Sequence, residues 1–231
     1  NGLDTVVLDA HDAGWGCSSR NGGQVSSSLK PSFQELSHKF GEVRAGELLK
    51  EGMNALKWIG DFIQEENIDC DFRRVGRYYG AHSLSQFKQL EKKIKEQPES
   101  LHVDVNLVSK SQQHAEIGSD FYHGGLVHPY HASLDPARFH QGLLERALTS
   151  GSQIKIHCAA NKIEKKGDFF QVHTEAGTMN AREVVVATGG YTGAVTPWHR
   201  RRVIPIGSYI IATETLEEDL VDQLIPKDRV I

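Results

Sequence analysis

A glycine-rich loop with several hydrogen-bond donors is the stretch of this sequence best suited to binding a ligand. It spans residues 14–25 and reads GWGCSSRNGGQV. Gly22 and Gly23 allow positive φ and a close approach of the backbone to a ligand. Side-chain donors that suit phosphate or ribose oxygens come from Ser18, Ser19, Arg20 and Asn21. A plain surface loop can have the same composition, so this stretch alone leaves both interpretations open.

The segment before the loop is an apolar run that ends in a carboxylate. Residues 4–9, DTVVLD, are typical of a buried parallel strand. In dinucleotide-binding βαβ units, an acidic residue at the end of the second strand binds a ribose hydroxyl roughly 20 residues after a glycine fingerprint. By this spacing the fingerprint precedes Asn1 by roughly ten residues, so we expect the chain to begin within the motif. The alternative is a strand that simply ends in a turn-forming Asp9.

Length and charge narrow the class of protein. The 231 residues, 39% of them hydrophobic, suffice for one large domain or two modest ones. Lys and Arg total 26 against 30 Asp and Glu, and the net charge of −4 gives no reason to expect nucleic acid. The one basic run, residues 199–202, is predicted to be a solvated turn, with contact to an anionic ligand as the alternative.

The number of cysteines and the hydropathy of the chain indicate the cellular compartment of the protein. Three scattered cysteines, Cys17, Cys70 and Cys158, provide neither a disulfide framework nor a zinc site, which fits a reducing cytosol. No apolar run approaches the roughly 18 residues of a membrane span. We therefore expect a cytoplasmic protein without a membrane span.

Metal binding by histidines and hydrolysis by a nucleophilic serine are two further kinds of chemistry to consider. His123, His128 and His131 lie close together, but no Cys or carboxylate stands beside them at ligand spacing, and Gly and Pro between them exclude a shared helix face. We predict structural or surface histidines and no metal site. The sequence contains no G-x-S-x-G motif, which argues against a hydrolase.

Hydrophobic periodicity predicts three helices. Apolar residues at three- and four-residue intervals indicate a long amphipathic helix over residues 45–63. A second helix is predicted over residues 84–97, stopped by Pro98. A third is predicted over residues 136–151, with Asp135 as its cap and proline in its first turn.

Strand patterns alternate with these helices. Strands are predicted over residues 72–80, 153–157, 162–165 and 169–174. Three valines bounded by small residues predict a further buried strand over residues 183–190, whose end exposes backbone rather than side chains.

Several of these motifs, taken in order, carry a family resemblance. They are VVLDA, GWGCSSRNGGQV, HASLDPARFHQGLLERALTSGSQIKIH and EVVVATGGYTG, followed by IPIGSYIIATE over residues 204–214. With them the chain resembles the FAD-dependent amine and amino-acid oxidoreductases of the D-amino-acid oxidase superfamily, and within it the gamma-glutamylputrescine oxidoreductase branch. In that branch residues 204–214 correspond to a strand.

The resemblance implies a set of residues that bind FAD. These are Asp9, Ala10, Ser18, Ser19, Arg20, Asn21, Gly22, Gly23, Gln24, Ile163, Ala187, Thr188, Gly189 and Gly190. It implies that Asp9 holds the adenosine ribose and that residues 18–24 wrap the pyrophosphate and the flavin edge. The backbone of Ile163 would meet the adenine, and residues 187–190 would let the cofactor lie against the main chain. Ser19 departs from the family pattern, which usually has glycine there.

The resemblance also implies an α/β fold in which an FAD-binding, Rossmann-like domain of the glutathione-reductase type is interrupted by a mixed-sheet α+β substrate domain. The FAD domain would take residues 1–70 and 133–195, and the substrate domain residues 71–132 and 196–231. Both are expected to be incomplete, with the chain truncated at both ends. The fragment by itself is then expected to bind FAD poorly and to be inactive.

The activity that the resemblance implies is oxidation of a C–N bond by hydride transfer to flavin N5. The substrate would be an amine or an amino acid, with a polyamine conjugate such as gamma-glutamylputrescine favoured, and oxygen or another acceptor would take the electrons. No catalytic residue can be named. A non-catalytic flavin- or nucleotide-binding module is the alternative, while RNA modification is disfavoured by the negative net charge.

Overall fold

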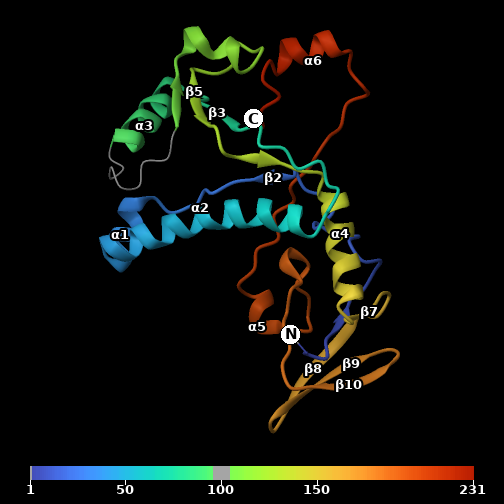
Figure 1. The fold of residues 1–231 in the computed structure, drawn as a ribbon. Coiled ribbons are helices and arrows are strands. Elements are labelled where there is room, and N and C mark those ends of the chain that lie inside the picture. Colours follow the sequence, from blue (N-terminus) through green and yellow to red (C-terminus); the bar gives the residue numbers. More distant parts are fainter. Residues whose placement is uncertain (1, 96–104) are drawn as a thin grey trace. The chain divides into compact units, whose positions relative to one another are not determined.

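The computed structural model describes residues 2–95 and 105–231 and divides the chain into two compact units. Unit 1 comprises Asn1–Asn21 and His140–Ile211, and unit 2 comprises Gly22–Phe139 and Ala212–Ile231 (Figure 1). The two units therefore alternate along the sequence, and each consists of two segments. The predicted α/β fold class is confirmed, because helices and sheets occur together. The boundaries of the FAD and substrate domains stay predictions. The two units are defined by contacts within the chain, and these contacts do not show which unit binds FAD or substrate.

A parallel pair of strands lies at the start of unit 1. β1 (Val6–Leu8) pairs with β7 (Gln153–Lys155), and the pairing extends to a 2.9 Å hydrogen bond from the Asp9 N–H to the Lys155 carbonyl. The predicted parallel strand over residues 4–9 is thus confirmed in type. It is not fully buried, since Val7 is 45% exposed.

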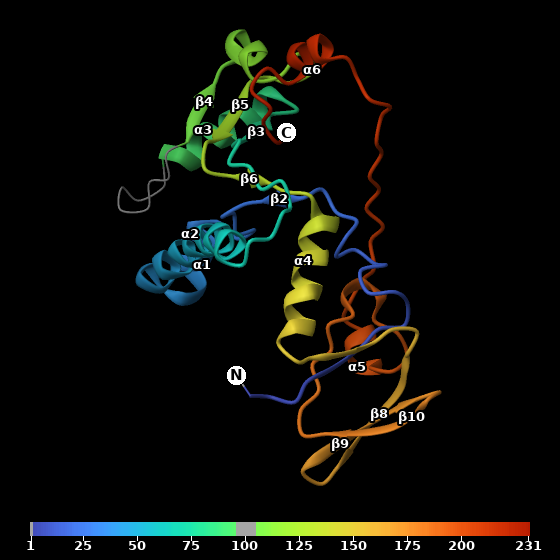
Figure 2. The same cartoon turned by 45° about the vertical axis from the view of Figure 1, so that its right-hand side comes forward.

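An antiparallel sheet of three strands follows in unit 1. β8 (Ala160–Lys166), β9 (Phe169–Thr174) and β10 (Gly177–Ala181) are arranged in the order β10-β9-β8 (Figure 2). Gly167, with φ of +60°, turns the chain between the first two strands. Both predicted strands are confirmed, whereas β10 was not predicted.

Two predicted strands of unit 1 are wrong. Residues 183–188 and 204–211 form no strand, and the 3-10 helix η3 (Gly189–Tyr191) ends the first segment. Val185 is 88% exposed and Tyr209 92% exposed. A strand is stable only when its backbone pairs with a neighbour, and neither segment pairs with one in the part of the chain that the structure describes.

Two helices of unit 2 pack side by side (Figure 1). α2 (Glu42–Glu65) confirms and extends the long helix predicted over residues 45–63. α1 (Phe33–Phe40) was not predicted, although Ser32 and Glu35 form a capping box at its start. The Glu35 N–H donates to the Ser32 hydroxyl at 3.2 Å, and the Ser32 N–H donates to the Glu35 carboxylate at 2.7 Å.

A second antiparallel sheet forms the core of unit 2. β3 (Arg77–Gly80), β5 (Gly125–His128) and β4 (Asn106–Val108) are arranged in the order β3-β5-β4, with α3 (Leu84–Lys95) against β5 (Figure 2). The strand predicted over residues 72–80 is shorter than expected, because its first half makes only an isolated bridge. The end of the predicted helix at Pro98 lies outside the described residues.

Other short elements complete the two units. They are β2 (Gln24–Val25), β6 (Ala132–Ser133), the 3-10 helix η2 (Lys110–Ala115), α4 (Pro136–Thr149), α5 (Pro197–Arg200) and α6 (Glu218–Leu224). α4 confirms the predicted third helix, and along it the chain passes from unit 2 into unit 1. None of the helices in residues 2–95 and 105–231 combines the length and apolarity that a membrane span needs.

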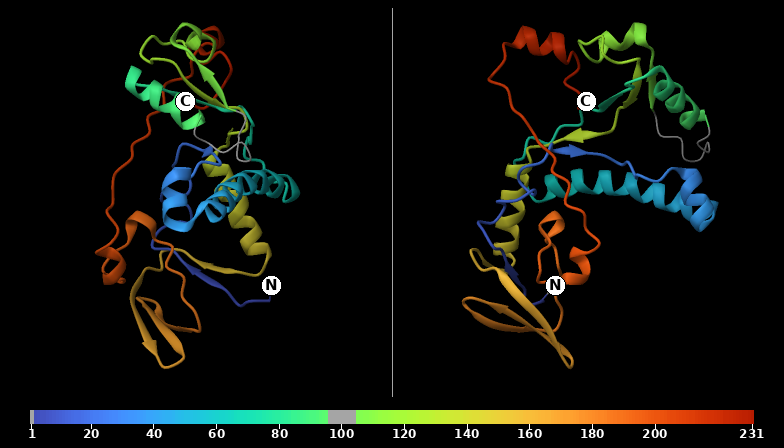
Figure 3. Two further views of the ribbon diagram at one scale, coloured as in Figure 1. Left: turned by 90° about the vertical axis from the view of Figure 1, so that its left-hand side faces the viewer. Right: turned by 180° about the vertical axis from the view of Figure 1, so that it is seen from behind.

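The C-terminal residues of unit 2 lie beside β3 (Figure 3). The Tyr78 N–H donates to the Val230 carbonyl at 2.7 Å, in a parallel bridge. Glu116, only 5% exposed, accepts from Lys227 Nζ at 2.7 Å and from Arg229 Nε at 2.6 Å. This carboxylate therefore anchors the C-terminal segment to the end of η2.

Gly23 shapes the antiparallel pair of β2 and β6. It is buried with φ of +60°, and its carbonyl accepts the Leu134 N–H at 2.9 Å. A methyl group at Gly23 would overlap the Leu134 carbonyl oxygen, whereas one at Gly22 would meet nothing closer than 3.8 Å. The two neighbouring glycines therefore differ in what the fold requires of them.

Glu116→Ala is expected to lower the free energy of unfolding by about 3 kcal/mol, because it leaves two cations without their buried partner. The control Glu47→Ala removes an exposed ion pair with Arg44 and should cost less than about 0.5 kcal/mol. Chemical denaturation measures both. Equal losses for the two variants would show that Glu116 does not anchor the C-terminal segment.

Gly23→Ala is expected to cost at least about 2 kcal/mol of unfolding free energy, because it combines a positive φ with a steric overlap. Gly22→Ala, the matched control, should change stability by about 0.5 kcal/mol or less. Thermal and chemical denaturation compare the two. A Gly23→Ala protein as stable as Gly22→Ala contradicts the assigned backbone geometry.

Candidate functional site

Asp9 stands at the carboxyl end of β1, in the position predicted for ribose binding. Its Oδ1 accepts the His11 N–H at 2.9 Å, and its backbone carbonyl accepts the Cys158 N–H at 2.8 Å. The half-buried carboxylate is thereby held in place, and its second oxygen has no partner among the described residues. A carboxylate oxygen in this state can accept a ligand hydroxyl. Ala10 follows it and is exposed.

The loop after β1 is closed by its own hydrogen bonds. Asn21 donates its side-chain amide to the Cys17 carbonyl at 3.0 Å, and the Arg20 guanidinium donates to the Trp15 carbonyl and lies 4.8 Å from the centre of its ring. The Ser19 hydroxyl donates to the Gly14 carbonyl. Three of the four side chains predicted as ligand donors are thus engaged within the loop, and Ser18 is exposed.

The serine that replaces the usual glycine introduces no backbone strain. Ser19 is not among the residues with positive φ, which in residues 14–25 are Gly14 at +83° and Gly23 at +60°. A Cβ atom at Gly14 would lie 2.7 Å from the His140 ring, so Gly14, like Gly23, is sterically required, whereas position 19 is not.

Tyr191 brings the loop together with residues 187–190. Its hydroxyl lies 3.6 Å from Cys17 Sγ, and its ring centre lies 6.0 Å from that of Trp15. A Cβ at Gly16 would lie 3.2 Å from the Tyr191 ring, so glycine allows this approach. The neighbouring Cys17 raises the pKa of the Tyr191 hydroxyl. Sequence reasoning missed Tyr191, although it directly follows the A-T-G-G motif.

The main chain of residues 187–190 is open to a ligand. Gly189, with φ of +52°, begins η3, and a Cβ added at either Gly189 or Gly190 would meet no atom within 4 Å. Ala187 and Thr188 are exposed as well. This free space along a glycine backbone fits the predicted passage of a cofactor against the main chain.

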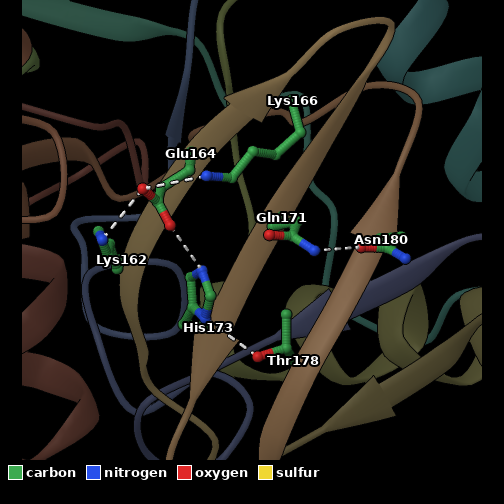
Figure 4. A network of polar contacts seen from close by, with 7 residues as sticks. All are labelled: Lys162, Glu164, Lys166, Gln171, His173, Thr178 and Asn180. Atoms are coloured by element: carbon green, nitrogen blue, oxygen red, sulfur yellow. Dashed lines mark hydrogen bonds and ion pairs between the residues drawn. The ribbon is translucent and has the colours of Figure 1, made fainter.

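Ile163 lies apart from these groups, in β8, where it pairs with Val172. The opposite face of that sheet is polar, as Figure 4 shows, and centres on Glu164. Lys162 at 3.0 Å, Lys166 at 3.6 Å and His173 at 3.1 Å surround this carboxylate. The Lys162 hydrogen bond is the main cause that lowers the pKa of Glu164. Ile163 alternates to the apolar face, and no described contact joins it to Asp9.

A cavity of about 530 Å³ lies between the β1–β7 pair and the β9–β10 turn. Its lining includes apolar side chains of Leu8, Ile154 and Met179, with His157 and Thr178 as polar groups. His157 has φ of +50° and is held by Asp12 at 2.9 Å. The cavity adjoins Leu8, the residue before Asp9, and its largely apolar walls with a few polar groups, Lys155 among them, are typical of a small-molecule site.

The remaining predicted residues belong to unit 2. Gly22 is exposed, Gly23 is buried, and Gln24 pairs with Ser133 across β2 and β6. The boundary between the units therefore falls inside the R-N-G-G motif, after Asn21. No group of three or more potential ligands for a metal ion occurs in residues 2–95 and 105–231.

Curated relatives are similar over nearly the whole chain. Gamma-glutamylputrescine oxidoreductase from Escherichia coli (strain K12) is 29% identical over 231 residues, which cover 98% of this chain and 53% of the relative. Probable oxidoreductase OrdL from Rhizobium meliloti (strain 1021) is 28% identical over 221 residues, which cover 94% and 50% respectively. The chain thus spans about half the length of the curated relatives it matches.

Solved structures share the fold. Glycine oxidase from Geobacillus kaustophilus matches with a TM-score of 0.67 and 14% identity, over 83% of this chain and 50% of that one. L-amino acid deaminase from Proteus vulgaris matches with a TM-score of 0.59 and 22% identity, over 82% and 43%. The family model described as FAD dependent oxidoreductase matches residues 1–230. With the glycine-lined backbone and strand-end carboxylate of unit 1, this match shows that the chain belongs to the FAD-dependent oxidoreductase family.

Proposed function

We propose that the whole protein is a flavoenzyme that oxidises a C–N bond of an amine or amino acid. Membership of the FAD-dependent oxidoreductase family supports the reaction class. The similarity to gamma-glutamylputrescine oxidoreductase supports a polyamine conjugate as substrate. Oxygen or another acceptor would then take the electrons. Three scattered cysteines support a cytoplasmic location.

One observation carries this proposal: the strand-end carboxylate, residues 14–21 of the loop after it and the open glycine backbone all belong to unit 1. Asp9 would accept a ribose hydroxyl of FAD, and the backbone at Gly189 and Gly190 would lie against the cofactor. Tyr191 holds that backbone segment to the loop through Cys17. Bound FAD supplies the hydride acceptor.

The loop would act through its fixed shape more than through free side chains. Because Ser19, Arg20 and Asn21 already bond within it, the loop is organised before a ligand arrives. Such preorganisation reduces the entropy that binding must overcome. Within unit 1, Ser18 would add a pyrophosphate contact and the backbone of Ile163 the adenine contact.

A non-catalytic flavin- or nucleotide-binding module is the second candidate. The residues assembled in unit 1 supply hydrogen bonds and ring surfaces, and these are sufficient for a binding module. None of these residues is placed as a general base. The two candidates differ in electron transfer. An enzyme accepts electrons from an amine, whereas a module has no such reaction.

Asp9→Ala in the full-length protein is expected to weaken FAD binding about tenfold to a hundredfold, because a charge-assisted hydrogen bond contributes about 1.5–3 kcal/mol. Asp4→Ala, which removes the same charge before β1, should leave the affinity unchanged. Fluorescence titration of the apoprotein with FAD measures both. Equal affinities in the two variants would remove Asp9 from the cofactor site.

The reaction itself is tested on the yellow full-length protein. Anaerobic addition of a gamma-glutamylated polyamine, or of an amino acid, is expected to bleach the flavin absorbance. A yellow protein that no amine bleaches favours the binding module. A full-length protein that is colourless after addition of FAD and removal of the unbound FAD contradicts the flavoenzyme and leaves only a module that binds a nucleotide without flavin.

A further inference from the structure

A basic segment of unit 1 is exposed and carries three arginines without an acidic partner. It comprises residues 197–204, which include α5, and each of these residues is exposed to solvent. None of the ion pairs in residues 2–95 and 105–231 involves Arg200, Arg201 or Arg202. The sequence predicts a solvated turn here, with contact to an anionic ligand as the alternative. Three uncompensated positive charges in succession favour that alternative.

Contacts within the basic segment hold its side chains in place. The Arg202 guanidinium donates to the Trp198 carbonyl at 2.9 Å and lies 3.8 Å from the centre of the Trp198 ring. The Arg202 N–H also donates to the His199 carbonyl at 2.8 Å, and Trp198 is 56% exposed. Tryptophan and arginine are enriched among the residues that dominate binding at protein interfaces. The basic segment therefore has the composition of a protein-binding surface.

An acidic segment of unit 2 has the opposite charge and is equally uncompensated. It comprises residues 214–222, which contain no Lys, Arg or His. Its carboxylates, all exposed, belong to Glu214, Glu217, Glu218, Asp219 and Asp222. The part of the chain that the structure describes provides none of them with an ion-pair partner. One chain thus carries two exposed segments of opposite charge.

α6 presents most of the acidic segment on a fixed support. The Gly118 N–H donates to the Leu224 carbonyl at 2.9 Å, and a Cβ at Gly118 would overlap the backbone at the end of the helix. Leu220 and Val221, which lie among the carboxylates, are 42% and 37% exposed. The acidic segment therefore offers negative charge together with apolar side chains, whereas the basic segment offers positive charge together with the Trp198 ring.

We propose that the basic segment of one copy of this chain binds the acidic segment of a second copy. Complementary charges attract two such surfaces and set their orientation. Contacts of the Trp198 ring with Leu220 and Val221 would exclude water from the surrounding ion pairs, which strengthens them. Neither segment contains a residue predicted to bind FAD, so this self-association does not depend on the proposed function.

Sedimentation velocity of the 231-residue chain at low ionic strength tests the association. The sedimentation coefficient is expected to rise with protein concentration. Sodium chloride at about 1 M should weaken the association at least tenfold, because the Debye length falls from about 10 Å at 0.1 M to about 3 Å at 1 M. A chain that stays monomeric at every concentration at low salt overturns the proposal.

Two charge-reversed variants show whether these segments are the ones that meet. The first carries Arg200→Glu, Arg201→Glu and Arg202→Glu, so that both of its segments are acidic. The second carries Glu218→Lys, Asp219→Lys and Asp222→Lys, so that both of its segments have a net positive charge. Each variant alone should be monomeric. An equimolar mixture should associate again, because only in the mixture does a segment of one chain meet an oppositely charged segment of another.

The control replaces three exposed lysines outside both segments, with Lys30→Glu, Lys50→Glu and Lys88→Glu. It changes the net charge as much as the first variant does and should associate like the unmodified chain. Association that persists in both reversed variants, or that 1 M salt leaves unchanged, belongs to another surface and contradicts the proposal. A mixture of the two variants that stays monomeric contradicts it as well.

Discussion

Parallel hydrogen bonding between β1 and β7 fixes the position of the candidate cofactor residues in unit 1. Asp9 donates its N–H to Lys155 and accepts that of Cys158, so the strand end is held by a segment far away in the sequence. The loop that closes through Cys17 and Tyr191 starts from this anchor. Fixing each loop residue costs about 1–2 kcal/mol of backbone entropy, which this anchor and the hydrogen bonds within the loop offset together.

Elements whose stabilising interactions are local could be predicted from the sequence. At the start of α4, Asp135 accepts the N–H groups of Ala137 and Arg138, which is the cap its sequence position indicates. The capping box of α1, Ser32 and Glu35, is also a local sequence pattern, although that helix was not predicted. Residues 183–190 and 204–214 have strand composition but lack strand structure, because pairing depends on a distant neighbour that composition does not specify.

In the candidate site too, local features could be predicted from the sequence, whereas contacts between distant residues could not. Residue types and spacing identified Asp9, the R-N-G-G loop and the A-T-G-G segment, which are all local patterns. Sequence could not show that the loop's donors bond to the loop itself, since that depends on turn geometry. Tyr191 was missed for a related reason, because its role is a contact with Cys17 across 174 residues of sequence.

Two charged groups near the sheet of unit 2 differ in how far the fold compensates their charges. Glu116 is buried, but Lys227 and Arg229 satisfy both of its oxygens, so its charge is accounted for within the fold. Arg77 is half-buried next to the imidazoles of His128 and His131 and has no acidic partner among the described residues. A charge removed from water without a partner is costly, and a fold that needed Arg77 only for packing would be at least as stable with an apolar side chain there. Of the two groups, only Glu116 has its charge compensated by described residues of the fold.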